Sequence, residues 1–165
     1  MKTFNTIFLT TILLSSSLYS ADKLYSFIGI QAGSASVKKD TVPSIGLKYG
    51  KQTKKYRTTL SYAYGETSNT KYDTLIAQID MGILSNTFKN SSFKPYAGIS
   101  FGVIQANDKL TGETDKGYLY GPNGGISYIF NDTLDLDLGY RYLKTSKLKN
   151  IDTMHDVSLS LHYFY

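Results

Sequence analysis

Apolar and polar residues alternate with a period of two along most of the chain. In the stretch 134–142, every even position is Leu or Tyr and every odd position is Asp, Gly or Arg. The last stretch repeats this pattern, with Val157 and Leu159 opening the apolar set and Tyr163 and Tyr165 closing it. A period of two is typical of β-strands that have one apolar face. No segment of useful length shows the period of an amphipathic helix.

The same alternation predicts eight strands, each bounded by Gly, Asn, Asp, Ser or Lys clusters. These strands run over residues 24–34, 42–50, 56–65, 72–84, 93–105, 117–130, 134–144 and 153–165. The predicted fold is therefore all-β: a closed, eight-stranded, antiparallel up-and-down β-barrel. Because the strand number is even, one end of the barrel should gather the longer loops, near 35–41, 66–71, 106–116 and 145–152.

Alternation alone does not tell whether the apolar face points into a soluble barrel or out toward lipid. The opposite face is polar and carries many of the 14 glycines, which suit a crowded barrel interior. Tyrosines fall at both ends of the apolar faces: Tyr49, Tyr56, Tyr128, Tyr163 and Tyr165 at one end, and Tyr62, Tyr64, Tyr118, Tyr120, Tyr140 and Tyr142 at the other. Aromatic girdles at both interfaces are expected of a transmembrane barrel, so the apolar face is predicted to meet lipid.

An alternating last strand ends directly on aromatic residues. In this feature the sequence resembles the small outer-membrane barrels of the OmpA-like and OmpX-like type, and the run from Pro95 to Gly102 also looks like the fifth strand of such proteins. The resemblance covers residues 21–165 and rests on pattern more than on identity. It implies a bacterial outer-membrane location, and it implies that the outer-membrane assembly machinery reads Phe164 and Tyr165.

The first twenty residues are interpreted as a cleaved secretory signal peptide. Lys2 is followed by an apolar stretch from Ile7 to Leu14 and by small polar residues, and cleavage is expected after Ser20. Residues 21–165 then form one barrel domain. The absence of Cys excludes disulfides, thiolate metal sites and cysteine nucleophiles. For an exported chain, the formal charge of +5 favours anionic lipid or polysaccharide over nucleic acid as a partner.

The inward face of the predicted barrel carries charges of both signs. Its main residues are Lys48, Arg57, Asp80, Asp137 and Arg141. Eight strands leave just enough room for side chains to fill the lumen, and buried charges must be paired to be tolerated. We therefore expect an interior network of ion pairs, for which Arg141, Arg57 and Lys48 against Asp137 and Asp80 are the candidates. Within this network, Arg141 is expected to compensate Asp137. A narrow pore lined by the same charges is the alternative.

Lysines gather in two loops that a closed barrel brings together. Because the last strand pairs with the first, the loop 145–152 should lie beside the loop 35–41. The lysines concerned are Lys38, Lys39, Lys144, Lys147 and Lys149. They form either a solvated loop face or a patch that binds the phosphates of lipopolysaccharide.

Catalytic and metal sites find little support in the sequence. Acyl transfer needs a nucleophile beside a base, and on a strand this partner would lie two residues away on the same face. His155 has Val157 at that position, and His162 faces inward. Two separated histidines give no metal-ligand spacing. We predict no catalytic, cofactor or metal site, a monomeric barrel, and a structural or interaction role in the cell envelope. The alternatives are a lipid-modifying enzyme and a small channel.

Overall fold

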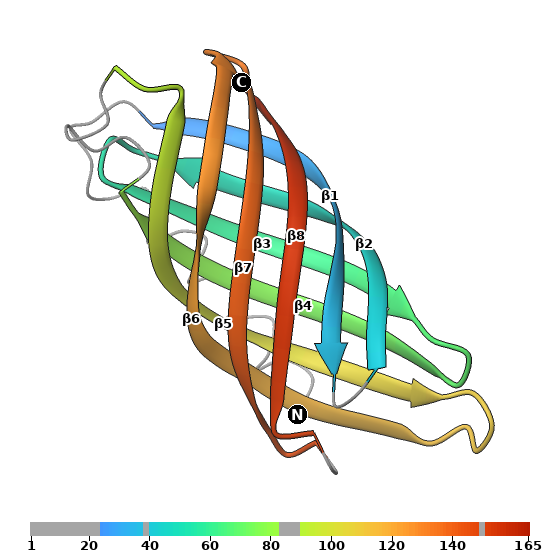
Figure 1. Ribbon diagram of the computed structural model, residues 1–165. Coiled ribbons are helices and arrows are strands. Elements are labelled where there is room, and N and C mark those ends of the chain that lie inside the picture. The colour runs from blue at the N-terminus through green and yellow to red at the C-terminus, as the bar shows by residue number, and fades with distance from the viewer. Residues whose placement is uncertain (1–23, 38–39, 83–89, 149–150) are drawn as a thin grey trace, which may run out of the picture.

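In the computed structural model of the protein, the described residues form a closed antiparallel β-barrel (Figure 1). These residues are 24–37, 40–82, 90–148 and 151–165. The strands follow in chain order: β1 (Tyr25–Val37), β2 (Asp40–Gln52), β3 (Tyr56–Glu66), β4 (Thr70–Met81), β5 (Phe93–Asp108), β6 (Thr114–Asn131), β7 (Leu134–Ser146) and β8 (Thr153–Phe164). The predicted fold class is confirmed. Within the described ranges, no helix is long and apolar enough to cross a membrane.

The barrel closes because β8 pairs with β1 as well as with β7. Pairing along β1 and β8 begins at Phe27 with Phe164 and continues to Val37 with Met154. Closure pairs the edge strands of the sheet, which is the condition for placing β-structure in lipid. The predicted signal peptide, 1–20, lies outside the described residues.

The strands reach further at one end than the alternation predicts. β1 continues to Val37 and β2 begins at Asp40, while β5 continues to Asp108 and β6 begins at Thr114. The connections at this end, which we call the outer end, are therefore shorter than the loops predicted near 35–41, 66–71, 106–116 and 145–152. The start of β1 and the end of β8 lie together at the opposite, terminal end (Figure 1). Strand β4 ends and strand β5 begins at the same end, at Met81 and Phe93.

Side chains alternate between the lumen and the outer surface. Along β8, Ser158 and His162 are buried, whereas Leu159 and Leu161 are exposed. The exposed large hydrophobic residues form an apolar band on every strand, including Ile28, Ile30, Ile45, Leu47, Ile79, Ile99, Phe101, Ile126, Leu138 and Leu159. The lumen wall is tight: a Cβ at Gly29 would overlap the imidazole of His162. The arrangement is the one expected for a barrel that faces lipid.

Candidate functional site

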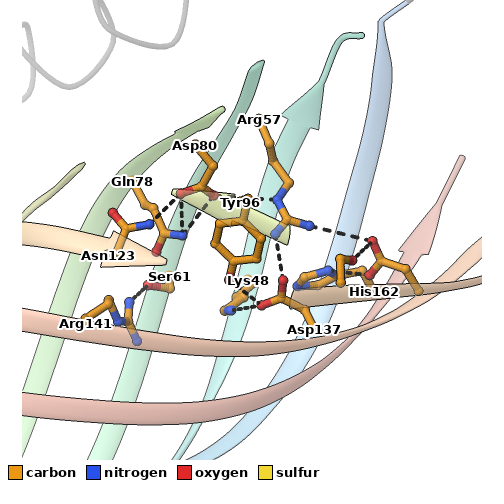
Figure 2. Close-up of polar contacts among 12 residues, drawn as sticks. Lys48, Arg57, Ser61, Gln78, Asp80, Tyr96, Asn123, Asp137, Arg141 and His162 are labelled. Atoms are coloured by element: carbon orange, nitrogen blue, oxygen red, sulfur yellow. Dashed lines mark hydrogen bonds and ion pairs between the residues drawn. The ribbon is translucent and has the colours of Figure 1, made fainter. Parts of the chain in front are cut away.

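Arg57 is the centre of an ion-paired network in the lumen (Figure 2). Its Nη2 donates a hydrogen bond of 2.7 Å to Asp137, and other guanidinium nitrogens lie 3.6 Å from Asp80 and Asp135. The guanidinium also lies 4.9 Å from the ring centre of Tyr96. Arg57 is 2% exposed and the three aspartates no more, so water does not compensate these charges.

Asp137 is held from three sides. Besides Arg57, it lies 3.6 Å from Nζ of Lys48 and accepts a hydrogen bond of 3.1 Å from the hydroxyl of Tyr96. These groups come from β2, β3, β5 and β7, so the contacts cross the lumen. Such contacts fix the distance between opposite walls. The sequence did not predict Tyr96 as part of this network, because an aromatic side chain carries no charge that would indicate an ionic partner.

Asp80 is bound mainly by amides. Gln78 donates hydrogen bonds of 2.9 and 2.8 Å to its two carboxylate oxygens, and Asn123 donates one of 2.6 Å. Asn123 in turn accepts a hydrogen bond of 2.9 Å from Ser100. The carboxylate is fully buried, and this chain of donors satisfies it without a second cation.

Asp135 and His162 form a second buried pair at the terminal end of the lumen. Nδ1 of His162 lies 2.7 Å from Asp135, which also accepts a hydrogen bond of 2.9 Å from Ser127. The imidazole packs against Phe27 with the rings tilted by 46° and their centres 4.7 Å apart. The carboxylate fixes the orientation of the imidazole, and because both side chains are buried in the lumen, the pair does not reach the lipid-facing surface.

The expected pair between Arg141 and Asp137 is wrong. Arg141 instead binds Asp156 on the neighbouring strand β8, with a hydrogen bond of 2.6 Å from Nε and a second contact from Nη2. Its Nη1 donates to Ser61 across the lumen at 3.2 Å (Figure 2). Arg141 and Asp156 are directly opposite in the β7–β8 register, which brings them together. The alternation places both side chains inside, but only the register identifies the partner.

Above Arg141, toward the outer end, the lumen becomes apolar. Buried aliphatic side chains from seven strands, all except β3, pack there with Ile151 of the β7–β8 connection. The cluster contains Ala35, Val37, Val42, Ile76, Ile104, Leu119, Leu143, Ile151 and Met154, and Tyr72 and Leu148 pack against it. We call this group the outer core. The sequence analysis did not predict it.

The outer turns are held by charged side chains. The backbone N–H groups of Thr111 and Leu110 donate hydrogen bonds of 3.0 and 2.8 Å to the carboxylate of Asp108. These bonds hold the pKa of Asp108 below its usual range. Across the neighbouring turn, Nζ of Lys109 lies 2.5 Å from Glu66, and this hydrogen bond lowers the pKa of Glu66.

Two of the five predicted patch lysines are placed in the structure. Lys144 and Lys147 are exposed at the outer end of β7, and Nζ of Lys147 lies 5.1 Å above the ring of Tyr118. The others, Lys38, Lys39 and Lys149, lie outside the described residues. The β1–β8 pairing brings the β1–β2 and β7–β8 connections to adjacent positions at the outer end.

His155 lies on the outer surface among aromatic residues. Its Nδ1 is 2.7 Å from the hydroxyl of Tyr140, and its ring packs edge-on against Tyr142 with centres 5.0 Å apart. Val157 follows it on the same face. In the described part of the chain, no group of three or more His, Cys, Asp or Glu side chains could hold a metal ion.

The two terminal aromatic residues point in opposite directions. Phe164 is buried in the lumen, where its ring lies 5.2 Å from that of Phe27, and its N–H donates to the carbonyl of Thr133. Tyr165 is 66% exposed on the outside, and its N–H donates to the carbonyl of Ser26. Both residues therefore belong to the closing seam of the barrel.

The barrel has an apolar band outside, tyrosines at the strand ends and paired charges inside. These features place the protein in the class of transmembrane β-barrels. The model of the outer membrane protein beta-barrel domain family matches residues 6–163, and the chain belongs to this family. The protein is thus a barrel of the bacterial outer membrane. No curated protein sequence gives a significant match.

Solved structures of the same fold include Neisserial surface protein A, with 20% identity and a TM-score of 0.68 over 86% of this chain and 97% of that chain. Outer membrane protein H from P. aeruginosa has 20% identity and a TM-score of 0.62 over 88% and 100% of the two chains. The outer membrane enzyme PagL has 13% identity and a TM-score of 0.51 over 82% and 97%. At these identities the likeness concerns the fold.

Proposed function

We propose that this outer-membrane barrel is an interaction protein whose outer end binds the phosphates of lipopolysaccharide. The observation that carries the proposal is the position of Lys144 and Lys147, exposed at the outer end beside the tyrosines of the apolar band. A lysine near an anionic membrane surface contributes about 1 kcal/mol to binding. The lysines of the adjacent connections, Lys38, Lys39 and Lys149, extend the proposed patch.

The lumen supports an interaction role over conduction. Its charged side chains form ion pairs with one another around Arg57 and Asp137. Closer to the outer end, the aliphatic side chains of the outer core fill the lumen. An ion moving along the axis would have to break buried ion pairs and then enter an apolar layer. We therefore expect negligible conductance in planar bilayers, and reproducible single-channel steps would contradict the proposal.

A lipid-modifying activity is the alternative that His155 raises. Its hydrogen-bond partner is the Tyr140 hydroxyl, and its neighbour on the same face is Val157, so a serine beside a base is not part of this cluster. Mass spectrometry of lipid A from cells with and without the protein tests this alternative. A change in acylation that depends on His155 would favour the enzyme.

The phosphate patch is tested by charge reversal. In the variant Lys144→Glu/Lys147→Glu, we expect less co-purifying lipopolysaccharide and a smaller stabilisation against urea when lipopolysaccharide is added. The matched control is Lys54→Glu/Lys55→Glu, which makes the same charge change on exposed residues at the terminal end. Added salt should weaken binding to the wild-type protein, because it screens exposed charges. If the patch variant keeps the wild-type ratio of lipopolysaccharide at low and high salt, the patch is only a solvated face.

A further inference from the structure

The polarity of the barrel wall reverses near the outer end along β4, β5 and β7. On β5, the inward residue Ser100 is polar and the outward residue Phe101 is apolar and 56% exposed. Four residues further on, the inward residue Ile104 is apolar and 2% exposed, and the outward residue is Gln105. The inside and outside of the wall have exchanged chemistry within one strand.

Strand β4 shows the same reversal. The inward residue Asp80 is fully buried near the terminal end, whereas Ile76, four residues closer to the outer end on the same face, is apolar and 1% exposed. On the outer surface, the apolar Ile79 gives way to Asp73 and the exposed Lys71. Asp73 accepts a hydrogen bond of 2.6 Å from the hydroxyl of Tyr62 on the outer surface.

Strand β7, on another part of the wall, reverses at the same level. Inside, Arg141 is followed by the fully buried Leu143. Outside, Tyr140 is followed by Tyr142 and then by the exposed Lys144. The reversal lies just above the tyrosines of the outer girdle, and the outer core fills the lumen at this level. The wall there is polar outside and apolar inside, which is the arrangement of a soluble barrel.

We propose that the outer ends of the strands form a collar that stands outside the hydrocarbon layer and presents its wall to the sugar and phosphate groups of the outer leaflet. The collar comprises residues 35–37, 40–43, 65–66, 70–74, 104–108, 114–117, 143–146 and 153–155. A lipid-facing wall needs an apolar exterior, and the collar lacks one. Its stability comes from the outer core, as in a soluble protein.

The collar also explains how a barrel with short turns can present a polar surface. The turns between strands at the outer end leave little chain to form an adhesive loop, whereas the collar exposes the strand ends themselves. On one part of this wall the charges are paired with each other, as Lys109 is with Glu66. The collar concerns the whole outer end, and it would stand even if Lys144 and Lys147 bound no phosphate.

The chain contains no Trp, so a single introduced Trp reports on one position only. We would compare Phe101→Trp with Gln105→Trp, which lie on the same face of β5 about 13 Å apart along the strand at about 3.3 Å per residue. Each variant is folded into phospholipid vesicles with brominated acyl chains, and folding is checked by heat-modifiable gel mobility. Tyr140→Trp and Lys144→Trp repeat the comparison on β7 and remain informative if a β5 variant does not fold.

We expect the emission of Phe101→Trp and Tyr140→Trp to be blue-shifted and mostly lost to bromine quenching. The emission of Gln105→Trp and Lys144→Trp should be red-shifted, nearly unaffected by brominated chains, and quenched by aqueous iodide. Equal quenching of the two positions of a folded pair by brominated chains would place the strand ends in the hydrocarbon and overturn the proposal.

Discussion

Replacing Arg57 by Met should strongly destabilise the barrel. The guanidinium contacts Asp137 at 2.7 Å and approaches Asp80 and Asp135 at 3.6 Å, and all of these side chains are buried. Asp80 and Asp135 keep their amide, hydroxyl and imidazole partners, so the main loss falls on Asp137, which retains Lys48 at 3.6 Å. Removing one partner of a buried ion pair costs about 3 to 5 kcal/mol. We expect a decrease of this size in the free energy of unfolding.

The assay is urea unfolding in phospholipid vesicles, followed by circular dichroism and heat-modifiable gel mobility. Lys55→Met is the matched control, because it removes an exposed cation in the turn before Arg57 and should leave stability nearly unchanged. Combining Arg57→Met with Asp137→Asn should cost less than the sum of the two single changes, with a coupling of about 0.5 to 3 kcal/mol. An Arg57→Met variant within about 1 kcal/mol of the wild type, well short of the cost of a broken buried pair, would refute the reasoning.

Three further predictions concern other parts of the barrel. Arg141→Ala should strand Asp156 in the lumen and cost about 3 to 5 kcal/mol; an unchanged urea midpoint would show that the pair is solvated. Deleting Phe164 and Tyr165 should reduce the barrel assembled in outer-membrane fractions, as measured by heat-modifiable mobility, and normal assembly would contradict an assembly role for these residues. The pKa of Asp108 is lowered in the folded turn. Its stabilising effect is therefore complete above the unfolded aspartate pKa of about 3.9 and disappears as the pH falls through the lower folded value. An NMR titration that gives Asp108 an ordinary pKa would contradict this.

Strict alternation was sufficient to predict the number of strands, whereas the lipid-facing side also required the glycines of the polar face and the tyrosines at the strand ends. It also places Arg57, Asp80 and Asp137 inside, where the structure has them. It does not predict which charges pair, because contacts across the lumen depend on the tilt and stagger of all the strands. This is why Arg141 is paired with Asp156 and not with Asp137.

The outer core was missed for a different reason. A single phase of alternation defines each predicted strand, so a reversal of that phase looks like the end of the strand. Val37 therefore fell within the predicted loop 35–41, and Val42 and Ile104 were not recognised as apolar residues that face inward. A strand that leaves lipid keeps its period of two but exchanges the roles of its faces. An abrupt change of phase within a strand is thus a signal that sequence reasoning could use.

The charged outer end has a consequence for the kinetics of insertion. If the barrel inserts from the terminal side, Lys71, Asp73, Lys109 and Lys144 must each pass through the hydrocarbon before they reach the far surface. Moving a charge through the bilayer centre costs about 2.5 to 3.5 kcal/mol per residue on insertion scales. Spontaneous insertion should therefore be limited by translocation of the strand ends rather than by pairing of the strands. A thinner or locally perturbed bilayer would accelerate it, and the same barrier would keep the inserted barrel from leaving.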